Sequence, residues 1–184
     1  MGGPEASMGP TITLEQILQF LLEAPMFGDL DPAELSEIVR VMQVQRLRPG
    51  QIVFREGDAG DAWYVLYEGS VEVLKEGMLE RRAIAELGPR QCFGEMAILD
   101  GSTRSASVRV LTDSTAFRFP RMEFAGLLNS GNLAAYKLVH QMARVLVARQ
   151  RETTSRLAEL LSRGDIEGVR AELSPIVRTS AVAE

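Results

Sequence analysis

The chain has 184 residues, of which 46% are apolar and 24% charged, a balance typical of a globular protein with a buried core. Its formal charge is −5, which argues against non-specific nucleic-acid binding, because proteins of that class are usually basic. A single cysteine, Cys92, excludes an intrachain disulfide and indicates a reducing compartment; we expect it to be a small buried residue. No apolar run reaches the ~18 residues of a membrane span, and no signal pattern opens the chain. The sequence therefore predicts a cytoplasmic protein without membrane contact.

Two short helices are predicted before any strand. Residues 1–10 contain three glycines and two prolines and are expected to be disordered. Thr13 is a suitable N-cap for a helix whose apolar residues recur at helical spacing as far as Pro25. Asp31 and Pro32 then begin a second helix, with aspartate as the cap and proline in the first helical position.

Between Val44 and Phe119 the pattern changes to short alternating runs separated by glycine, proline and aspartate. Short strands with turn signals at regular intervals are typical of an antiparallel sandwich or barrel. The aromatic side chains of the run from Trp63 to Tyr67 are expected to pack in its core. The predicted fold class is α+β and mainly β: an antiparallel β-barrel or jelly roll flanked by N-terminal helices and a long C-terminal helix.

Helical character returns at Pro120, with a short helix predicted over 121–128 and a longer one from Leu133 to about Ser162. At ~1.5 Å per residue the longer helix spans roughly 45 Å, too long to bury its whole apolar face on a small barrel. We therefore predict a homodimer through this helix; a helix that folds back on its own domain is the alternative. The predicted divisions are a disordered segment (1–10), a barrel with its N-terminal helices (11–132), a dimerisation or hinge helix (133–163) and a tail (164–184).

One stretch, from Phe93 to Val108, contains the residue types that an anionic ligand with an attached sugar requires. It reads FGEMAILDGSTRSASV. Gly94 allows the backbone to come close to a ligand, Glu95 can accept a hydrogen bond from a hydroxyl, and Arg104 offers a fork of donors for phosphate oxygens. From composition alone the same stretch also fits a plain strand–turn–strand.

The order of these elements resembles the cyclic nucleotide-binding domain of catabolite-activator-type regulators, protein kinase A regulatory subunits and cyclic-nucleotide-gated channels. The resemblance covers roughly residues 14–155. The segment RPGQIVFREGDAGDAWYVLYEGSVEV resembles the opening strands of that family, with glycines at Gly50, Gly57 and Gly69. The segment FGEMAILDGSTRSASV resembles its phosphate-binding cassette.

The resemblance implies roles for individual cassette residues. Glu95 would accept from the ribose 2′-hydroxyl, and Gly94 would permit close approach of the sugar. Arg104 would pair with the exocyclic phosphate oxygens, together with the backbone N–H groups of Ala97 and Ser105. The Ser105 hydroxyl could also donate to phosphate or to a purine edge.

The resemblance leaves the choice of nucleotide open. Alignment of the long helix places Arg149 and Gln150 nearest the base, but neither is the small hydroxyl residue typical of the family. Thr103 stands where the family often has proline. The predicted ligand-binding residues are Gly94, Glu95, Met96, Ala97, Arg104, Ser105, Ala106, Arg149 and Gln150. No catalytic residue, metal or cofactor is predicted.

The sequence is therefore interpreted as a regulatory module that binds cAMP, with cGMP as the alternative, and signals through its long helix to an unidentified protein partner. Too few residues follow Ser162 for a helix-turn-helix, so we expect no direct DNA binding. One alternative is a dimeric interaction module in which Glu95 and Arg104 pair with each other and no nucleotide binds. Another is an enzyme with Glu95 as base. His140 is distant in sequence and no nucleophile–base pair or metal-ligand spacing appears, so the enzyme is the weaker hypothesis and His140 is expected at the surface or in the helix seam.

Overall fold

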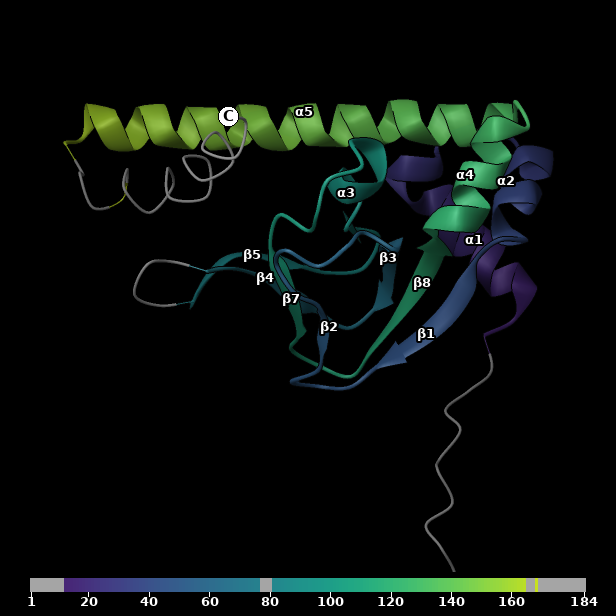
Figure 1. Cartoon of the computed structure of the whole chain (residues 1–184), viewed down its shortest axis with the longest axis horizontal. Coiled ribbons are helices and arrows are strands. Elements are labelled where there is room, and N and C mark those ends of the chain that lie inside the picture. The colour runs from purple at the N-terminus through teal and green to yellow at the C-terminus, as the bar shows by residue number, and fades with distance from the viewer. Residues whose placement is uncertain (1–11, 77–80, 165–167, 169–184) are drawn as a thin grey trace, which may run out of the picture.

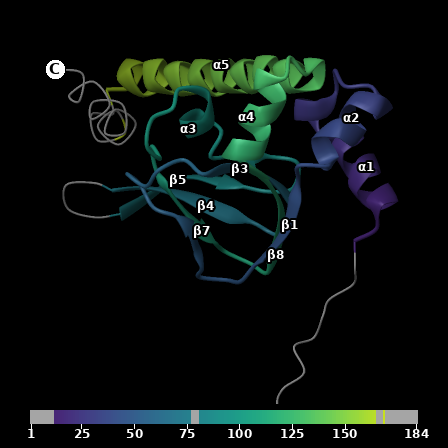
Figure 2. The ribbon, with the colours of Figure 1, turned by 45° about the vertical axis from the view of Figure 1, so that its right-hand side comes forward.

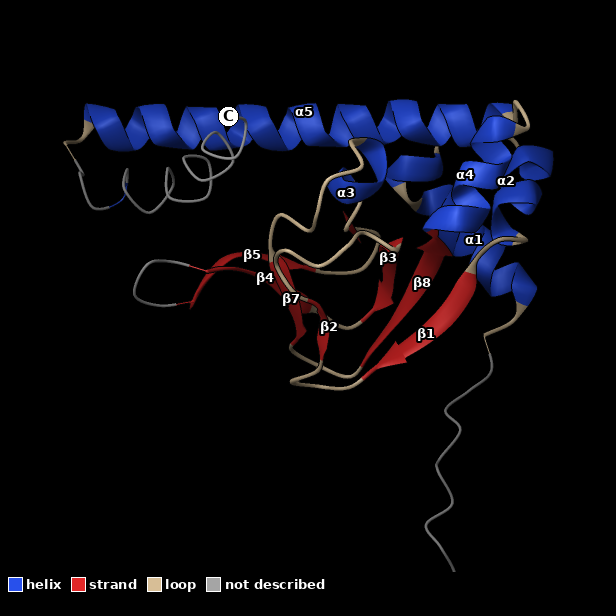
Figure 3. Ribbon diagram, viewed as in Figure 1, coloured by secondary structure: helices blue, strands red, loops and turns tan. Residues whose placement is uncertain are grey.

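The computed structural model describes residues 12–76, 81–164 and 168. It contains two four-stranded antiparallel sheets with most of the helices gathered at one end, and one long helix that runs along the whole assembly (Figures 1 and 3). The predictions for residues 1–10 lie outside the described residues, as do those for 164–184 apart from Gly164 and Gly168.

The predicted helices and strands follow one another in the expected order, and two short helices, η1 and α3, are added to them. The helices are α1 (Leu14–Glu23), the 3-10 helix η1 (Pro25–Phe27), α2 (Pro32–Val39), α3 (Met96–Leu99), α4 (Arg121–Asn129) and α5 (Leu133–Ser162). The strands are β1 (Gln43–Leu47), β2 (Ile52–Phe54), β3 (Ala62–Glu68), β4 (Val71–Glu76), β5 (Arg81–Leu87), β6 (Cys92–Phe93), β7 (Ser107–Val110) and β8 (Ser114–Pro120).

The strand order is β1-β8-β3-β6 in one sheet and β2-β7-β4-β5 in the other. Strands distant in sequence are paired in both, as in a jelly roll. The prediction of a jelly-roll-like α+β fold is confirmed, with one correction: the sheets form an open sandwich and do not close into a barrel.

Both N-terminal helices begin at the cap residues predicted from the sequence, Thr13 and Asp31, and each cap is part of a capping box. Thr13 Oγ1 accepts from the N–H of Gln16 at 3.2 Å, and Gln16 Oε1 accepts from the N–H of Thr13 at 2.8 Å. Asp31 and Glu34 make the equivalent exchange at 2.9 Å in each direction. These reciprocal bonds satisfy backbone donors that have no partner inside a helix.

Buried aromatic rings join the sheets to the helices. Trp63 is fully buried and stacks on Phe119 with ring centroids 4.1 Å apart, while Phe27 and Phe124 approach it from η1 and α4. In the second core cluster, Tyr64 of β3 stacks on Phe93 of the adjacent strand β6, with ring centroids 5.0 Å apart. The prediction that the aromatic residues of β3 pack in the core is confirmed for Trp63 and Tyr64.

Helix α5 changes character along its length. Its first half buries Ala135, Leu138 and Met142 against the helical end of the domain, and Lys137 pairs with Glu34 of α2 at 2.6 Å. Its second half extends past the sandwich, above α3 (Figures 1 and 2).

Within the described part of the chain, no helix combines the length and the apolar character needed to span a bilayer.

Candidate functional site

The cassette predicted from the sequence links β6 to β7 and contains the four-residue helix α3. Gly94 precedes α3 with φ +78°, a left-handed conformation that side chains rarely adopt. A Cβ at this position would lie 2.7 Å from Nη1 of Arg104. Glycine is therefore required so that the arginine can pack against the cassette backbone.

Arg104 is a buried cation held from several sides. Only 2% of its surface is exposed. Its Nη1 donates to the carbonyl of Gly94 at 2.8 Å, and its Nη2 donates to the carbonyl of Ala62 at 2.7 Å and to Asp61 Oδ1 at 2.8 Å. The guanidinium carbon lies 4.1 Å from the ring centroid of Phe54. Its Nε is buried and has no hydrogen-bond partner among the described residues, so this donor of the fork is unsatisfied.

Asp61 reaches this arginine from the exposed side. It also accepts from Arg118 Nη2 at 2.7 Å, and 62% of its side chain is accessible. Burial raises the pKa of Asp61, but hydrogen bonds and charge from Arg118 and Arg104 together outweigh that effect and lower it below its usual value. Arg104 thus already holds an anionic oxygen, which belongs to the accessible carboxylate of Asp61.

Glu95 is the second buried charge of the cassette, with 2% of its surface exposed. Its Oε1 accepts from Nη1 of Arg149 on α5 at 2.8 Å, while Nη2 of Arg149 donates to the carbonyl of Cys92 at 2.8 Å. Burial raises the pKa of the Glu95 carboxyl, and the charge of Arg149 opposes this without cancelling it. Burial also raises the pKa of the Cys92 thiol to about 12, with a contribution from Glu95. Cys92 is therefore an inert buried thiol, as expected.

The structure brings most of the predicted site residues together. Met96 and Ala97 lie in α3, and the hydroxyl of Ser105 approaches the sulfur of Met96 at 3.7 Å, so the two ends of the cassette meet. Ala106 is buried beside the start of β7. Gln150 lies exposed on α5, where its carbonyl accepts from Thr154 at 2.9 Å.

Glu95 and Arg104 do not pair with each other, contrary to the alternative in which they form an internal ion pair. Each instead has its own partner, Arg149 for the glutamate and Asp61 for the arginine.

Sequence reasoning missed several residues around Arg104. Asp61 lies 43 residues away along the chain, and Phe54 lies on β2, far from the cassette in sequence. A partly buried pair, Lys75 with Glu56 at 2.8 Å, lies next to the cassette. The only local signal was the presence of acidic residues in the glycine-rich segment GDAGD, which gives no indication of their partners.

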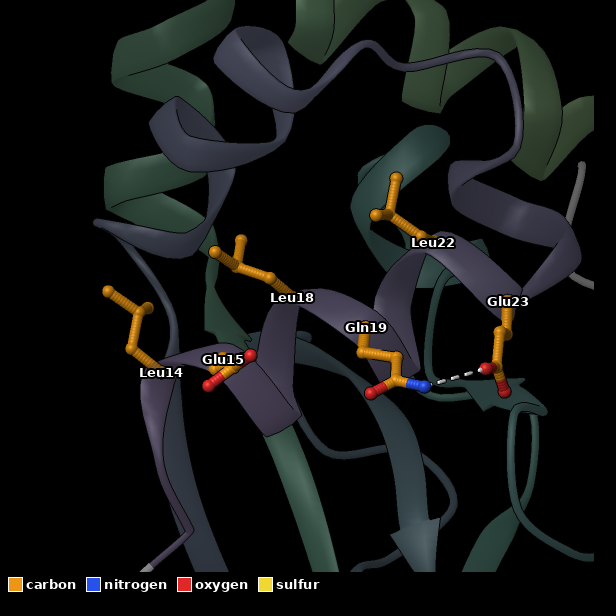
Figure 4. Close-up of a pocket in the computed structure, with 6 residues that line it drawn as sticks. All are labelled: Leu14, Glu15, Leu18, Gln19, Leu22 and Glu23. Atoms are coloured by element: carbon orange, nitrogen blue, oxygen red, sulfur yellow. Dashed lines mark hydrogen bonds between the residues drawn. The ribbon is translucent and has the colours of Figure 1, made fainter.

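A separate surface depression of about 740 Å³ lies along α1 (Figure 4). It is lined by Leu14, Glu15, Leu18, Gln19, Leu22 and Glu23. All six residues come from one helix, and none belongs to the cassette. Nothing in the structure shows what covers this face.

Comparison with known proteins gives a match to the part of the chain that contains the strands and the cassette. Residues 44–131 match the family model of the cyclic nucleotide-binding domain. A cAMP-dependent protein kinase regulatory subunit of Emericella nidulans is 36% identical over 109 residues, which are 59% of this chain and 26% of that protein. A cyclic AMP receptor protein of Thermus thermophilus is 32% identical over 140 residues, which are 76% of this chain and 62% of that protein. The chain thus spans only part of the length of these relatives.

Solved structures agree with this assignment. A cyclic nucleotide-binding domain from Methylobacillus flagellatus superposes with a TM-score of 0.72 at 26% identity, covering 79% of this chain and 84% of that one. The regulatory domain of Toxoplasma gondii protein kinase A, crystallised with cAMP, gives a TM-score of 0.58 at 26% identity, covering 64% and 45%. The sandwich, its cassette and these likenesses together lead to one conclusion: residues 44–131 of this chain match the cyclic nucleotide-binding domain family.

Proposed function

We propose that this domain binds a cyclic nucleotide, cAMP in the first instance, with the phosphate at Arg104. The observation that carries this proposal is the state of that guanidinium: it is buried, it holds the carboxylate of the accessible Asp61, and its Nε has no partner among the described residues. An arginine fork suits phosphate oxygens as well as a carboxylate. Asp61 keeps Arg118 as a partner when a phosphate takes its place on Arg104.

The sugar is proposed to bind at Glu95. A carboxylate has two oxygens and about four lone-pair sites, and Arg149 occupies one of these on Oε1. Acceptor capacity therefore remains for a ribose hydroxyl. Gly94 supplies the close backbone approach, and the N–H groups of Ala97 and Ser105 complete the proposed site around the phosphate.

The choice of cAMP rests on the relatives. The names of the Emericella nidulans and Thermus thermophilus proteins refer to cAMP, and the Toxoplasma gondii domain was crystallised with it. We propose cGMP as the second ligand to test, because no residue of the described site distinguishes the two purines.

The proposed output element is α5. Arg149 connects it to Glu95, so occupation of the sugar site acts directly on a helix that is also packed against α2 and α4. We propose that the bound nucleotide changes how α5 lies on the domain and that a partner reads this change.

The first partner to test is a second copy of the chain. On α5, which the structure describes throughout, one row of residues with alternating spacings of three and four faces away from the domain. Its members are Leu133, Tyr136, His140, Ala143, Val147, Gln150, Thr154, Leu157 and Leu161. Each of them is exposed or half-exposed, and the row includes the four exposed large apolar side chains of the helix. This is the a/d spacing of a two-stranded coiled coil, so we define these nine residues as the α5 seam.

A second candidate function is an interaction module of the same fold that binds no nucleotide. It is favoured by the internal pairs, because Glu95 and Arg104 each already have a partner of opposite charge. A fold neighbour at 23% identity and a TM-score of 0.63 is described as the regulatory subunit of a cAMP-independent protein kinase A. The fold alone therefore does not imply cAMP binding.

Titration calorimetry with cAMP separates the two functions. The proposed function predicts saturable binding of one cAMP per chain, with an affinity at least about 100-fold lower in Arg104→Gln. The matched control is Arg156→Gln, because Arg156 is an exposed arginine that pairs only within α5, with Glu152 at 2.8 Å. Absence of binding in the unsubstituted protein at millimolar cAMP would favour the interaction module.

A further inference from the structure

A partly buried ion pair lies next to the proposed phosphate site. Lys75 on β4 is 9% exposed, and its Nζ donates to Glu56 Oε1 at 2.8 Å and to the carbonyl oxygen of Ser105 at 2.7 Å. Ser105 is the residue that follows Arg104. Lys75 therefore holds the cassette backbone one peptide beyond the proposed phosphate ligand.

Glu56, the partner of Lys75, is itself held by two hydrogen bonds to neighbouring strands. Its Oε2 accepts from the backbone N–H of Glu76 at 3.1 Å, and its own N–H donates to the hydroxyl of Ser107 at 2.8 Å. The loop between β2 and β3 is thus tied to β4 and to the start of β7 at once.

The same loop holds the backbone of Arg104 itself. The Arg104 N–H donates to the carbonyl of Asp58 at 2.8 Å, and the Gly57 N–H donates to the carbonyl of Arg104 at 2.9 Å. Together with the bond from Lys75 to Ser105, three backbone groups of Arg104 and Ser105 are held by one loop and one ammonium group.

An ion pair in this position is expected to contribute little to the stability of the fold. Desolvation of two charges offsets much of their attraction, and apolar residues of similar size often stabilise a fold as well or better. A group that must meet a ligand, in contrast, has to be held within about 0.5 Å of its working geometry. We propose that Lys75 and Glu56 are positioning residues that hold Arg104 for the phosphate of the cyclic nucleotide, an inference that rests on the proposed function.

The pair is neutral overall, which allows a clean test. Lys75→Met with Glu56→Gln removes both charges and leaves the net charge near the site unchanged, so a loss of affinity reports geometry rather than electrostatics. The chain also provides a matched control on the same strand, β4: the buried Glu72 of β4 pairs with Arg109 of β7. None of the contacts described for that pair involves the cassette.

The expected result is a cAMP affinity about tenfold lower in Lys75→Met/Glu56→Gln, since even a small displacement of a binding group from its working position weakens binding strongly. Arg109→Met/Glu72→Gln should bind cAMP within about twofold of the unsubstituted protein. In an Arg104→Gln background, removal of Lys75 and Glu56 should lower the remaining affinity by less than about threefold, because residues that act through one another are not additive.

Three results would overturn the proposal: unchanged affinity in Lys75→Met/Glu56→Gln, an equal loss in the control pair, or a full additive loss on top of Arg104→Gln. If the double variant does not fold, Glu56→Gln alone serves, with a loss of about threefold expected against none for Glu72→Gln. Binding by the unsubstituted protein is measured in the same series. Its absence refutes the proposed function and the positioning role together, whereas intact binding with an inert Lys75–Glu56 pair refutes the positioning role only.

Discussion

Glu95 of the cassette and Arg149 of α5 form an ion pair at 2.8 Å, although 54 residues separate them along the chain. The glutamate is buried, whereas 38% of the arginine side chain remains exposed. This is the contact through which the proposed sugar site and the proposed output helix touch. A change at either end of the pair should therefore be measurable at the other.

Arg149→Met should weaken cAMP binding by about tenfold, because a hydrogen bond to a charged group typically contributes ~1.5–3 kcal/mol. Without the guanidinium, Glu95 stays buried and its pKa rises further, so the affinity should begin to fall at a higher pH than in the unsubstituted protein. Calorimetry at pH 6, 7 and 8 measures both effects. Arg156→Met on the exposed face of α5 is the control, and equal behaviour of the two variants would remove Arg149 from the site.

The affinity for cAMP should decrease in acid, through the raised pKa of Glu95. Above that pKa the carboxylate is ionised and accepts from the ribose hydroxyl; below it the carboxyl is protonated and its pair with Arg149 is lost. The effect on stability has the opposite sign: a folded-state pKa above the unfolded value stabilises the fold when the group is protonated, and that contribution is lost as the pH rises through it. Binding titrations and thermal melts from pH 4.5 to 7.5 should therefore change in opposite directions for this group.

Glu95→Gln provides the check on that assignment. The variant should bind cAMP weakly with an affinity that no longer depends on this titration, and it should melt in the absence of ligand no earlier than the unsubstituted protein, since the buried charge has been removed. A pH dependence of affinity that persists in Glu95→Gln would assign the titration to another group.

Arg104→Gln should lower cAMP affinity at least about 100-fold, because the charge-assisted donors to phosphate are lost. It should also cost about 1–3 kcal/mol of unfolding free energy, since the buried carbonyls of Gly94 and Ala62 lose their donor. Arg104→Lys keeps the charge without the fork, so its cAMP affinity should lie between those of Arg104→Gln and the unsubstituted protein. Urea unfolding and calorimetry separate stability from binding. A variant that folds and binds cAMP normally would place the phosphate elsewhere.

Val147→Glu should dissociate the proposed dimer, because it places like charges opposite each other in the α5 seam. Ala148→Glu adds the same charge at the next position, which is exposed but outside the seam, and should leave the dimer intact. Sedimentation velocity at several protein concentrations distinguishes the two variants. An unsubstituted protein that sediments as a monomer at about 100 μM would contradict the proposal before any substitution is made.

The features predicted correctly from the sequence are those with local causes. Thr13 and Asp31 cap helices through residues three positions away, and the boundaries of α5 follow from a long run without glycine or proline. Gly94 lies in the left-handed conformation that favours glycine, in the same short segment as Glu95 and Arg104; its role in ligand binding stays a prediction.

The partners of the charged residues could not be predicted in the same way. Asp61 approaches Arg104 from the start of β3, and Arg149 approaches Glu95 from α5, so both pairs depend on how distant elements pack. The sequence indicates which side chains carry charge, but their pairing is a property of the tertiary structure. The Lys75–Glu56 pair could not be predicted for the same reason, because an isolated lysine on an alternating strand is indistinguishable from a solvated one.

The most direct test of the central claim is a thermal melt of the protein alone and with cAMP, cGMP or AMP. Ligand at about a hundred times its dissociation constant stabilises the folded state by ~2.7 kcal/mol, which corresponds to a rise of roughly 5–10 °C in the midpoint for a domain of this size. We expect such a rise in the midpoint with cAMP and none with AMP, and the response to cGMP reports the purine preference. No shift with either cyclic nucleotide at millimolar concentration would contradict nucleotide binding and favour an interaction module that works through α5.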